Sequence, residues 1–100
     1  MVTRDETSII DAVREAVAAI PPGSVASYGD IGTRIGAGPR QVGRAMSLLD
    51  DNVPWWRVVY ADGTTASCHG GRAPALLLEE GTPVAGKRVD MQRARQGWMD

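Results

Sequence analysis

The chain has 100 residues, 43% of them hydrophobic and 23% charged, with a formal net charge of −1 and a single cysteine, Cys68. This length predicts one domain over residues 1–100 and excludes a multidomain protein, while the hydrophobic content excludes a disordered chain. One cysteine excludes an intramolecular disulfide and a thiolate zinc site. No apolar run reaches the roughly 18 residues of a membrane span, and no signal-peptide pattern starts the chain. We therefore expect a soluble cytoplasmic protein that has no membrane contact. We also expect no metal and no cofactor.

Charge is distributed unevenly along the sequence. Residues 1–30 contain five acidic and two basic residues, whereas residues 31–49 contain three arginines and no acid. The global charge argues mildly against a nucleic-acid partner, but this segregation would let a polyanion meet a local basic face.

Two helices separated by glycines follow a longer first helix. Apolar residues at three- and four-residue steps predict the first helix over residues 8–20. A short second helix begins after Ser27, whose hydroxyl forms a capping-box pattern with Asp30, and it ends before the glycines of residues 36–38. A third helix over residues 39–49 starts with a proline, which suits the first turn of a helix. Helix, glycine-rich turn and helix together predict a helix-turn-helix.

The third helix has two faces. Its apolar residues fall at four- and three-residue spacing and should face the core: Val42, Met46 and Leu49. Its polar face comprises Arg40, Arg44 and Ser47. Gly43 costs roughly 1 kcal/mol relative to alanine inside a helix, which indicates close approach to another backbone. The arginine face is either a solvated surface, which charge spacing alone favours, or the face of a recognition helix on DNA.

The second half of the chain is predicted to add strands and one helix. Two β-prone runs, residues 53–60 and 64–67, flank Asp62-Gly63 and predict a β-hairpin, which with the helices gives a winged-helix shape. Residues 72–80 predict a last helix with three buried leucines, followed by a closing segment that packs back through Val89 and Trp98. The expected fold is α+β, a small helical domain with a winged helix-turn-helix core and a short β-hairpin.

Two residue pairs are candidates for chemistry. Trp55 and Trp56 can form a flat wall for a planar ligand or a flipped base, although aromatic content alone favours hydrophobic core. Cys68 and His69 are adjacent, and on an extended chain their side chains point to opposite sides, so we do not expect them to share a proton. The sequence contains no paired-carboxylate, phosphate-loop or metal-ligand pattern.

Three ordered motifs between residues 9 and 81 resemble the C-terminal domain of O6-alkylguanine-DNA alkyltransferases and, more closely, the alkyltransferase-like proteins. The motifs are Ile20-Pro21-Pro22-Gly23 with Ser27-Tyr28-Gly29-Asp30-Ile31, then Pro39-Arg40-Gln41-Val42-Gly43-Arg44-Ala45-Met46, then Val53-Pro54-Trp55-Trp56-Arg57-Val58-Val59. In the alkyltransferases a cysteine in the third motif takes the alkyl group. Trp55 occupies that position here, as a tryptophan does in the alkyltransferase-like proteins, which bind the lesion without repairing it and flag it for nucleotide excision repair.

The resemblance implies a non-enzymatic monomer that binds double-stranded DNA containing O6-alkylguanine, with nucleotide excision repair proteins as further partners. Tyr28 matches the tyrosine that helps rotate the nucleotide out, and Arg40 matches the arginine that enters the stack in its place. Gly43 and Ala45 match small residues that let the helix lie in the minor groove. The implied lesion pocket consists of Tyr28, Val53, Pro54, Trp55 and Arg72, and the implied DNA-binding residues are Ser27, Tyr28, Pro39, Arg40, Gln41, Gly43, Arg44, Ala45 and Ser47.

Departures from the family keep two alternatives open. Trp56 stands where these relatives usually keep a histidine, and Arg72 is the nearest residue to replace an arginine that reads the lesion in some of them. Arg57 is expected to hold the pocket loop, and with Trp55 at the pocket we expect Trp56 to be the core residue of the tryptophan pair. The alternatives are a winged-helix transcriptional regulator that reads an operator with Arg40 and Arg44, and an active alkyltransferase that uses Cys68.

Overall fold

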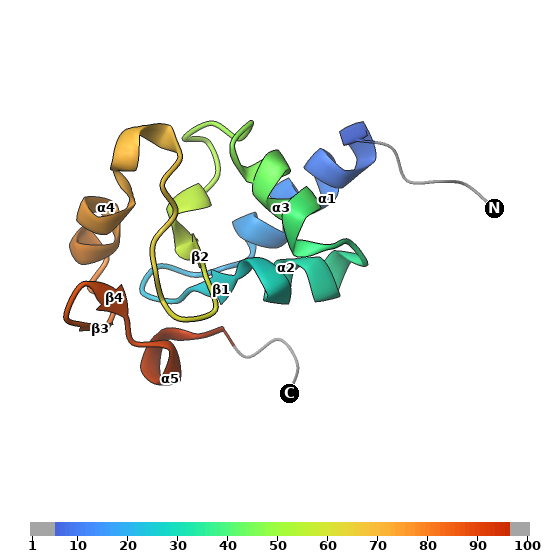
Figure 1. The fold of residues 1–100 in the computed structure, drawn as a ribbon. Coiled ribbons are helices and arrows are strands. Elements are labelled where there is room, and N and C mark those ends of the chain that lie inside the picture. The colour runs from blue at the N-terminus through green and yellow to red at the C-terminus, as the bar shows by residue number, and fades with distance from the viewer. Residues whose placement is uncertain (1–5, 97–100) are drawn as a thin grey trace.

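The computed structural model describes residues 6–96, and Figure 1 shows α1, α2 and α3 grouped on one side of the molecule, α4 with the β3–β4 hairpin on the other, and β1 and β2 between them. In chain order the elements are α1 (Glu6–Ala18), β1 (Ala26–Ser27), α2 (Tyr28–Ile35), α3 (Pro39–Met46), a 3-10 turn (Trp55–Arg57), β2 (Val58–Val59), a second 3-10 turn (His69–Gly71), α4 (Ala73–Glu79), β3 (Val84–Ala85), β4 (Arg88–Val89) and α5 (Met91–Ala94).

The helix-turn-helix is formed by α2 and α3, and α2 is fixed at both ends. The Ser27 hydroxyl accepts a hydrogen bond from the Asp30 amide at 2.9 Å, and the Asp30 carboxylate accepts one from the Ser27 amide at 3.1 Å, as the capping-box pattern predicts. Gly36 ends the helix in the left-handed conformation. A Cβ on Gly32 would lie 2.4 Å from the Ala37 carbonyl oxygen, so only glycine allows the turn to fold back so tightly.

The strands pair differently from the predicted hairpin. Residues 55–57 form a turn, so only β2 is extended, and it pairs in parallel with β1. The second predicted arm contributes a single bridge between Val59 and Thr65. The regular hairpin lies later, where β3 and β4 pair antiparallel. The α+β class is confirmed. Of the hairpin predicted over residues 53–67 only the tip forms, at the Val59–Thr65 bridge, because the turn after Pro54 takes the start of its first arm out of extended conformation.

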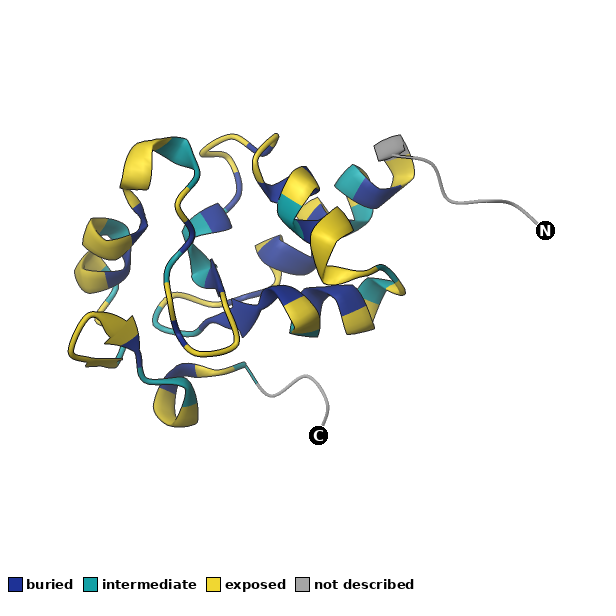
Figure 2. Cartoon of the chain, viewed as in Figure 1, coloured by how far each residue is buried: buried dark blue, intermediate teal, exposed yellow. Residues whose placement is uncertain are grey.

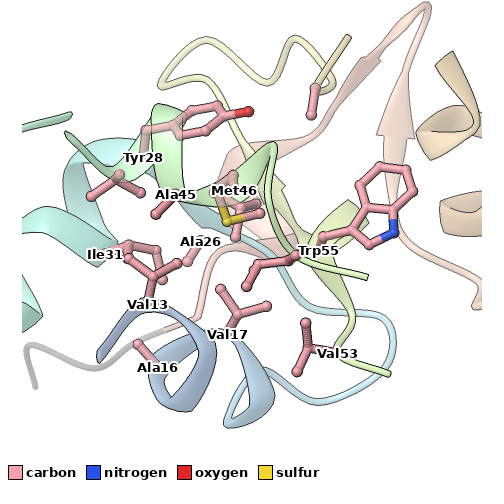
Figure 3. Close-up of a cluster of buried hydrophobic side chains, with 14 of the residues drawn as sticks. Val13, Ala16, Val17, Ala26, Tyr28, Ile31, Ala45, Met46, Val53 and Trp55 are labelled. Atoms are coloured by element: carbon pink, nitrogen blue, oxygen red, sulfur yellow. The ribbon is translucent and has the colours of Figure 1, made fainter. Parts of the chain in front are cut away.

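Most of the core lies between the three N-terminal helices and Trp55, which Figure 3 labels. Figure 2 shows buried and exposed residues alternating along these helices. The predicted core residues of the third helix are buried: Val42, Met46 and Leu49. Of the three leucines in α4, Leu77 is buried but Leu78 is 64% exposed, so the prediction that all are buried is wrong. Successive helical residues point about 100° apart, so one narrow helix face cannot bury three in a row.

The tryptophan pair is arranged opposite to expectation. Trp55 is 0% exposed within the core, whereas Trp56 is half-buried, and their rings meet edge to face with centroids 5.6 Å apart. The Trp55 Nε1 donates to Asp51 at 2.8 Å, and the Trp56 Nε1 donates to Glu80 at 2.9 Å. The prediction that Trp56 is the core member of the pair is wrong, because its indole is held by the hydrogen bond to the Glu80 carboxylate.

Arg57 joins this turn to two distant segments. Its guanidinium forms an ion pair with Glu80 and donates to the Ile20 carbonyl oxygen at 2.7 Å. Burial opposes ionisation of Glu80, but the hydrogen bonds from Arg57 and Trp56 outweigh it and hold the pKa of Glu80 below its usual value. Arg57 therefore has the structural role that the sequence indicates.

The C-terminal segment packs against the residue that precedes β1. The Val25 amide donates to the Ala94 carbonyl oxygen at 2.9 Å, and the Gln96 amide donates to the Val25 carbonyl oxygen at 2.7 Å. Val89 is buried in a second cluster, which confirms its predicted packing. Trp98, the other residue predicted to pack there, lies outside the described residues.

Replacing Trp55 by alanine is expected to lower the free energy of unfolding by about 3 to 5 kcal/mol, because a fully buried ring leaves a large cavity. Trp56→Ala should cost about 1 to 3 kcal/mol, since that ring is only half-buried. Urea or thermal unfolding of both variants checks the order. A Trp56→Ala protein less stable than Trp55→Ala would contradict this packing.

Candidate nucleic-acid interface

The outward face of α3 is polar and basic. Pro39, Arg40, Gln41 and Arg44 are exposed, as is Ser47 directly after the helix. No acidic residue lies among residues 31–49, so this face carries positive charge only. The predicted DNA-binding residues of this helix therefore share one accessible surface, with the exception of Ala45. That residue is 2% exposed and faces the core, and its role as a small residue that lets the helix lie in the minor groove stays a prediction.

Gly43 lies half-buried between the two arginines of this face. A Cβ built on Gly43 would meet no atom of another part of the described chain within 4 Å. The cost of a helical glycine, roughly 1 kcal/mol, is therefore not explained by internal packing. A helix surface without a side chain is one that an external partner can approach closely.

A cavity of about 490 Å³ opens beside this face. It lies between the helix-turn-helix and the segment that follows β2, and its lining residues are Tyr28, Pro39, Arg40, Gly43, Arg44, Tyr60, Ser67 and Cys68. The only charged lining groups are the two arginines. Basic groups at one side and neutral groups at the other suit a ligand with an anionic part and an uncharged planar part.

Tyr28 closes the cavity on the core side. The residue is 9% exposed, and its ring centroid lies 4.8 Å from that of Tyr60 with the planes tilted by 43°. Burial raises the pKa of the Tyr28 hydroxyl, and the nearby Cys68 and Tyr60 raise it further. The phenol therefore stays neutral and can donate a hydrogen bond.

The predicted lesion pocket is divided between two places. Tyr28 lines the cavity, but Val53, Pro54, Trp55 and Arg72 do not. Figure 3 shows the rings of Tyr28 and Trp55 well separated in the cluster. Trp55 is fully buried, so the prediction that its ring forms an accessible wall is wrong in this structure.

Arg72 is held away from the cavity by an ion pair. It donates two hydrogen bonds of 3.0 Å to the Asp51 carboxylate, and its guanidinium carbon lies 5.5 Å from the Trp55 ring centroid. Hydrogen bonds from Arg72, and then from Trp55, hold the pKa of Asp51 at about 2. The Arg72 charge is thus already compensated, and its predicted place in the pocket lining is wrong.

Cys68 and His69 meet, contrary to expectation. His69 has a left-handed backbone with φ of 58°, so the chain is not extended there and the Cys68 Sγ lies 3.0 Å from His69 Nδ1. The His69 Nε2 donates to the Leu49 carbonyl oxygen, and Nδ1 is the ring nitrogen that meets the thiol. The His69 ring stacks on Trp55 with centroids 4.0 Å apart. Trp55 therefore supports the cavity wall from behind.

Two serines and a glutamine have capping roles. Ser27 is 5% exposed and its hydroxyl caps α2, and its DNA contact stays a prediction. The Ser47 hydroxyl donates to the Arg44 carbonyl oxygen at 2.7 Å, and the Gln41 side chain accepts from the Gly38 amide at 3.0 Å. Both remain exposed and can contact a partner.

Sequence reasoning missed Tyr60 and Ser67 as lining residues and assigned Cys68 only to an alternative. Tyr60 is an aromatic residue directly after the apolar run of β2, where the chain turns, and that position could have indicated an exposed ring. Across residues 6–96, no group of three His, Cys, Asp or Glu side chains could hold a metal ion. None of the helices in the same range is long and apolar enough to cross a bilayer.

Known proteins are similar to this chain in sequence. The model of the 6-O-methylguanine DNA methyltransferase DNA-binding domain matches residues 8–82. A DNA base-flipping protein of Escherichia coli K12 is 38% identical over 97 residues, covering 90% of this chain and 75% of that protein. Alkyltransferase-like protein 1 of Schizosaccharomyces pombe is 39% identical over 80 residues, covering 72% of this chain and 74% of that protein.

Solved structures of similar proteins superpose on this chain. S. pombe Atl1 in complex with damaged DNA containing O6-carboxymethylguanine superposes with a TM-score of 0.81 at 28% identity, over 96% of this chain and 98% of that one. Mycobacterium tuberculosis OGT in complex with DNA gives a TM-score of 0.65 at 37% identity, over 72% of this chain and 48% of that one. The matched family model covers more than half of the sequence, so the chain belongs to the family of the 6-O-methylguanine DNA methyltransferase DNA-binding domain.

Proposed function

We propose that this protein recognises O6-alkylguanine in double-stranded DNA and binds it without removing the alkyl group. One observation carries the proposal: the bare surface at Gly43 lies between two exposed arginines and borders a cavity closed by Tyr28. A DNA backbone can approach that surface, and a nucleotide rotated out of the duplex can enter the adjoining cavity. The resemblance in sequence and the solved complexes of similar proteins with DNA support the same reading.

The charges of α3 fit this geometry. Arg44 is suited to neutralise phosphates, while Arg40, next to the start of the helix, extends toward the base stack. Extruding a base costs a few kcal/mol, and a side chain inserted into the vacancy offsets part of that cost. The neutral Tyr28 hydroxyl is placed to contact the backbone of the rotated nucleotide.

The neutral side of the cavity suits the alkylated base. Ser67 and the protonated Cys68 thiol present no charge, and apolar contact with an alkyl group contributes roughly 0.8 kcal/mol per buried methylene. Trp55, stacked behind His69, supports this wall and does not contact the base.

Alkyl transfer requires a thiolate at the cavity. Trp55 occupies the position of the reactive cysteine of related alkyltransferases, and burial raises the pKa of the Cys68 thiol, which keeps it protonated. The chain therefore acts as a binder. We propose that it works as a cytoplasmic monomer on the chromosome and that nucleotide excision repair acts on the marked lesion.

A regulator that reads the major groove is the other candidate for a basic helix-turn-helix. Such a protein has no use for a cavity beside its recognition helix or for a bare glycine in the middle of it. The structure therefore favours lesion recognition.

The purified protein is expected to bind a duplex containing O6-methylguanine at least about tenfold more tightly than the same duplex with guanine, which is about 1.4 kcal/mol. Arg40→Ala should remove most of this preference, because the vacancy in the stack is then unfilled. Arg34→Ala, a change at an exposed arginine near the end of α2, is the matched control. Fluorescence anisotropy titrations check both, and equal losses for the two variants would indicate simple phosphate contacts.

No methyl group is expected to move from DNA to protein. Incubation with a duplex carrying a labelled O6-methyl group should leave all label on the DNA, because the thiol that lines the cavity is protonated. Intact-mass analysis of wild type and Cys68→Ser provides the readout. A stoichiometric mass gain of one methylene in wild type alone would show that Cys68 is an alkyl acceptor.

Gly43→Leu should separate folding from binding. The variant is expected to be as stable as wild type or up to about 1 kcal/mol more stable, because leucine favours a helix and no part of the described chain obstructs its Cβ. Its affinity for duplex DNA should fall at least about tenfold, since the side chain fills the approach surface. Ala18→Leu at the end of α1 is the control, and full DNA binding by Gly43→Leu would show that this surface is not the interface.

A further inference from the structure

Tyr60 holds an exposed aromatic ring on a rigid backbone. It follows β2 directly, and its side chain is 48% exposed. The Tyr60 amide donates to the Thr64 carbonyl oxygen at 2.9 Å, and its own carbonyl oxygen accepts from the Gly63 amide at 2.9 Å. The turn is itself packed tightly, because a Cβ on Gly63 would lie 2.3 Å from the Val89 carbonyl oxygen. The backbone that carries the ring is therefore fixed on both sides.

The ring is placed between the core and the cavity. One side meets Tyr28, with centroids 4.8 Å apart, and Tyr28 is itself packed in the core. Tyr60 also lines the cavity together with Arg40 and Gly43. An aromatic ring backed by another ring, accessible from a basic cavity, is the arrangement by which proteins stack unpaired bases.

We propose that Tyr60 is the stacking surface for the extruded base, with Tyr28 behind it as a rigid support. This inference rests on the proposed function, since it requires a base to leave the duplex. Stacking uses the π-face of the base and not its hydrogen-bonding edge. Tyr60 therefore contributes affinity for any base that enters the cavity, and it leaves discrimination between alkyl groups to the neutral wall at Ser67 and Cys68.

The test compares two duplexes that differ only in the presence of a base. The first contains O6-methylguanine at one position, and the second contains an abasic site there. Wild type, Tyr60→Ala, Tyr60→Phe and Leu78→Ala are titrated against both by fluorescence anisotropy. Leu78 is the matched control, because it is also a large exposed residue, on α4, and does not line the cavity. Thermal unfolding establishes that each variant is folded.

Tyr60→Ala is expected to weaken binding of the O6-methylguanine duplex about 5- to 150-fold, the range of base–aromatic stacking. Its affinity for the abasic duplex should match wild type, because no base is there to stack. Tyr60→Phe should bind both duplexes as wild type does, and so should Leu78→Ala.

Three results would overturn the stacking role. Equal losses on both duplexes would make Tyr60 a backbone contact or a support of the site. A loss in Tyr60→Phe equal to that in Tyr60→Ala would assign the effect to the hydroxyl, and no loss in Tyr60→Ala would remove the residue from the interface. Failure of the proposed function gives a different result from failure of the stacking role. In that case wild type itself would show no preference for the O6-methylguanine duplex over the guanine duplex of the earlier titration.

Discussion

The guanidinium of Arg57 connects three segments that are far apart in the sequence: the residues that follow α1, the turn that contains both tryptophans, and the residue after α4. It does so through the Ile20 carbonyl oxygen and the Glu80 carboxylate. The Arg57 and Glu80 side chains are only 12% and 15% exposed, so loss of either would leave a largely desolvated charge without its partner. Because Glu80 also accepts from Trp56, this one cluster decides which tryptophan enters the core.

The candidate nucleic-acid interface has two layers. The outer layer consists of accessible groups on α3 and at the cavity rim, which are suited to meet DNA. The inner layer is a series of contacts from Cys68 through His69 to Trp55, ending at the ion pair of Asp51 and Arg72. Trp55 is fully buried in this inner layer and supports it by stacking on His69.

Local patterns predicted the helices well, because caps, glycines and apolar spacing act over a few residues. The Ser27–Asp30 capping box and the buried side of α3 are examples. The pairing of β1 with β2 was not predictable, since two-residue strands are too short to show an alternation of apolar and polar residues. That Trp55 is fully buried and Trp56 only half-buried depends on the hydrogen bond from Trp56 to Glu80, which lies 24 residues further along the chain. The contact of Cys68 with His69 depends on the positive φ of His69, a backbone conformation that is uncommon for residues other than glycine.

The hydrogen bonds between Val25 and the C-terminal segment give that segment a protective role. Residues 94–96 lie along the backbone just before β1 and satisfy both the amide and the carbonyl of Val25. Without them, a strand edge next to the helix-turn-helix would present unpaired backbone groups, which is a template for association with other chains. Residues 94–96 thus cover this edge, and their removal would expose it to association with other chains while leaving every residue that lines the cavity in the sequence.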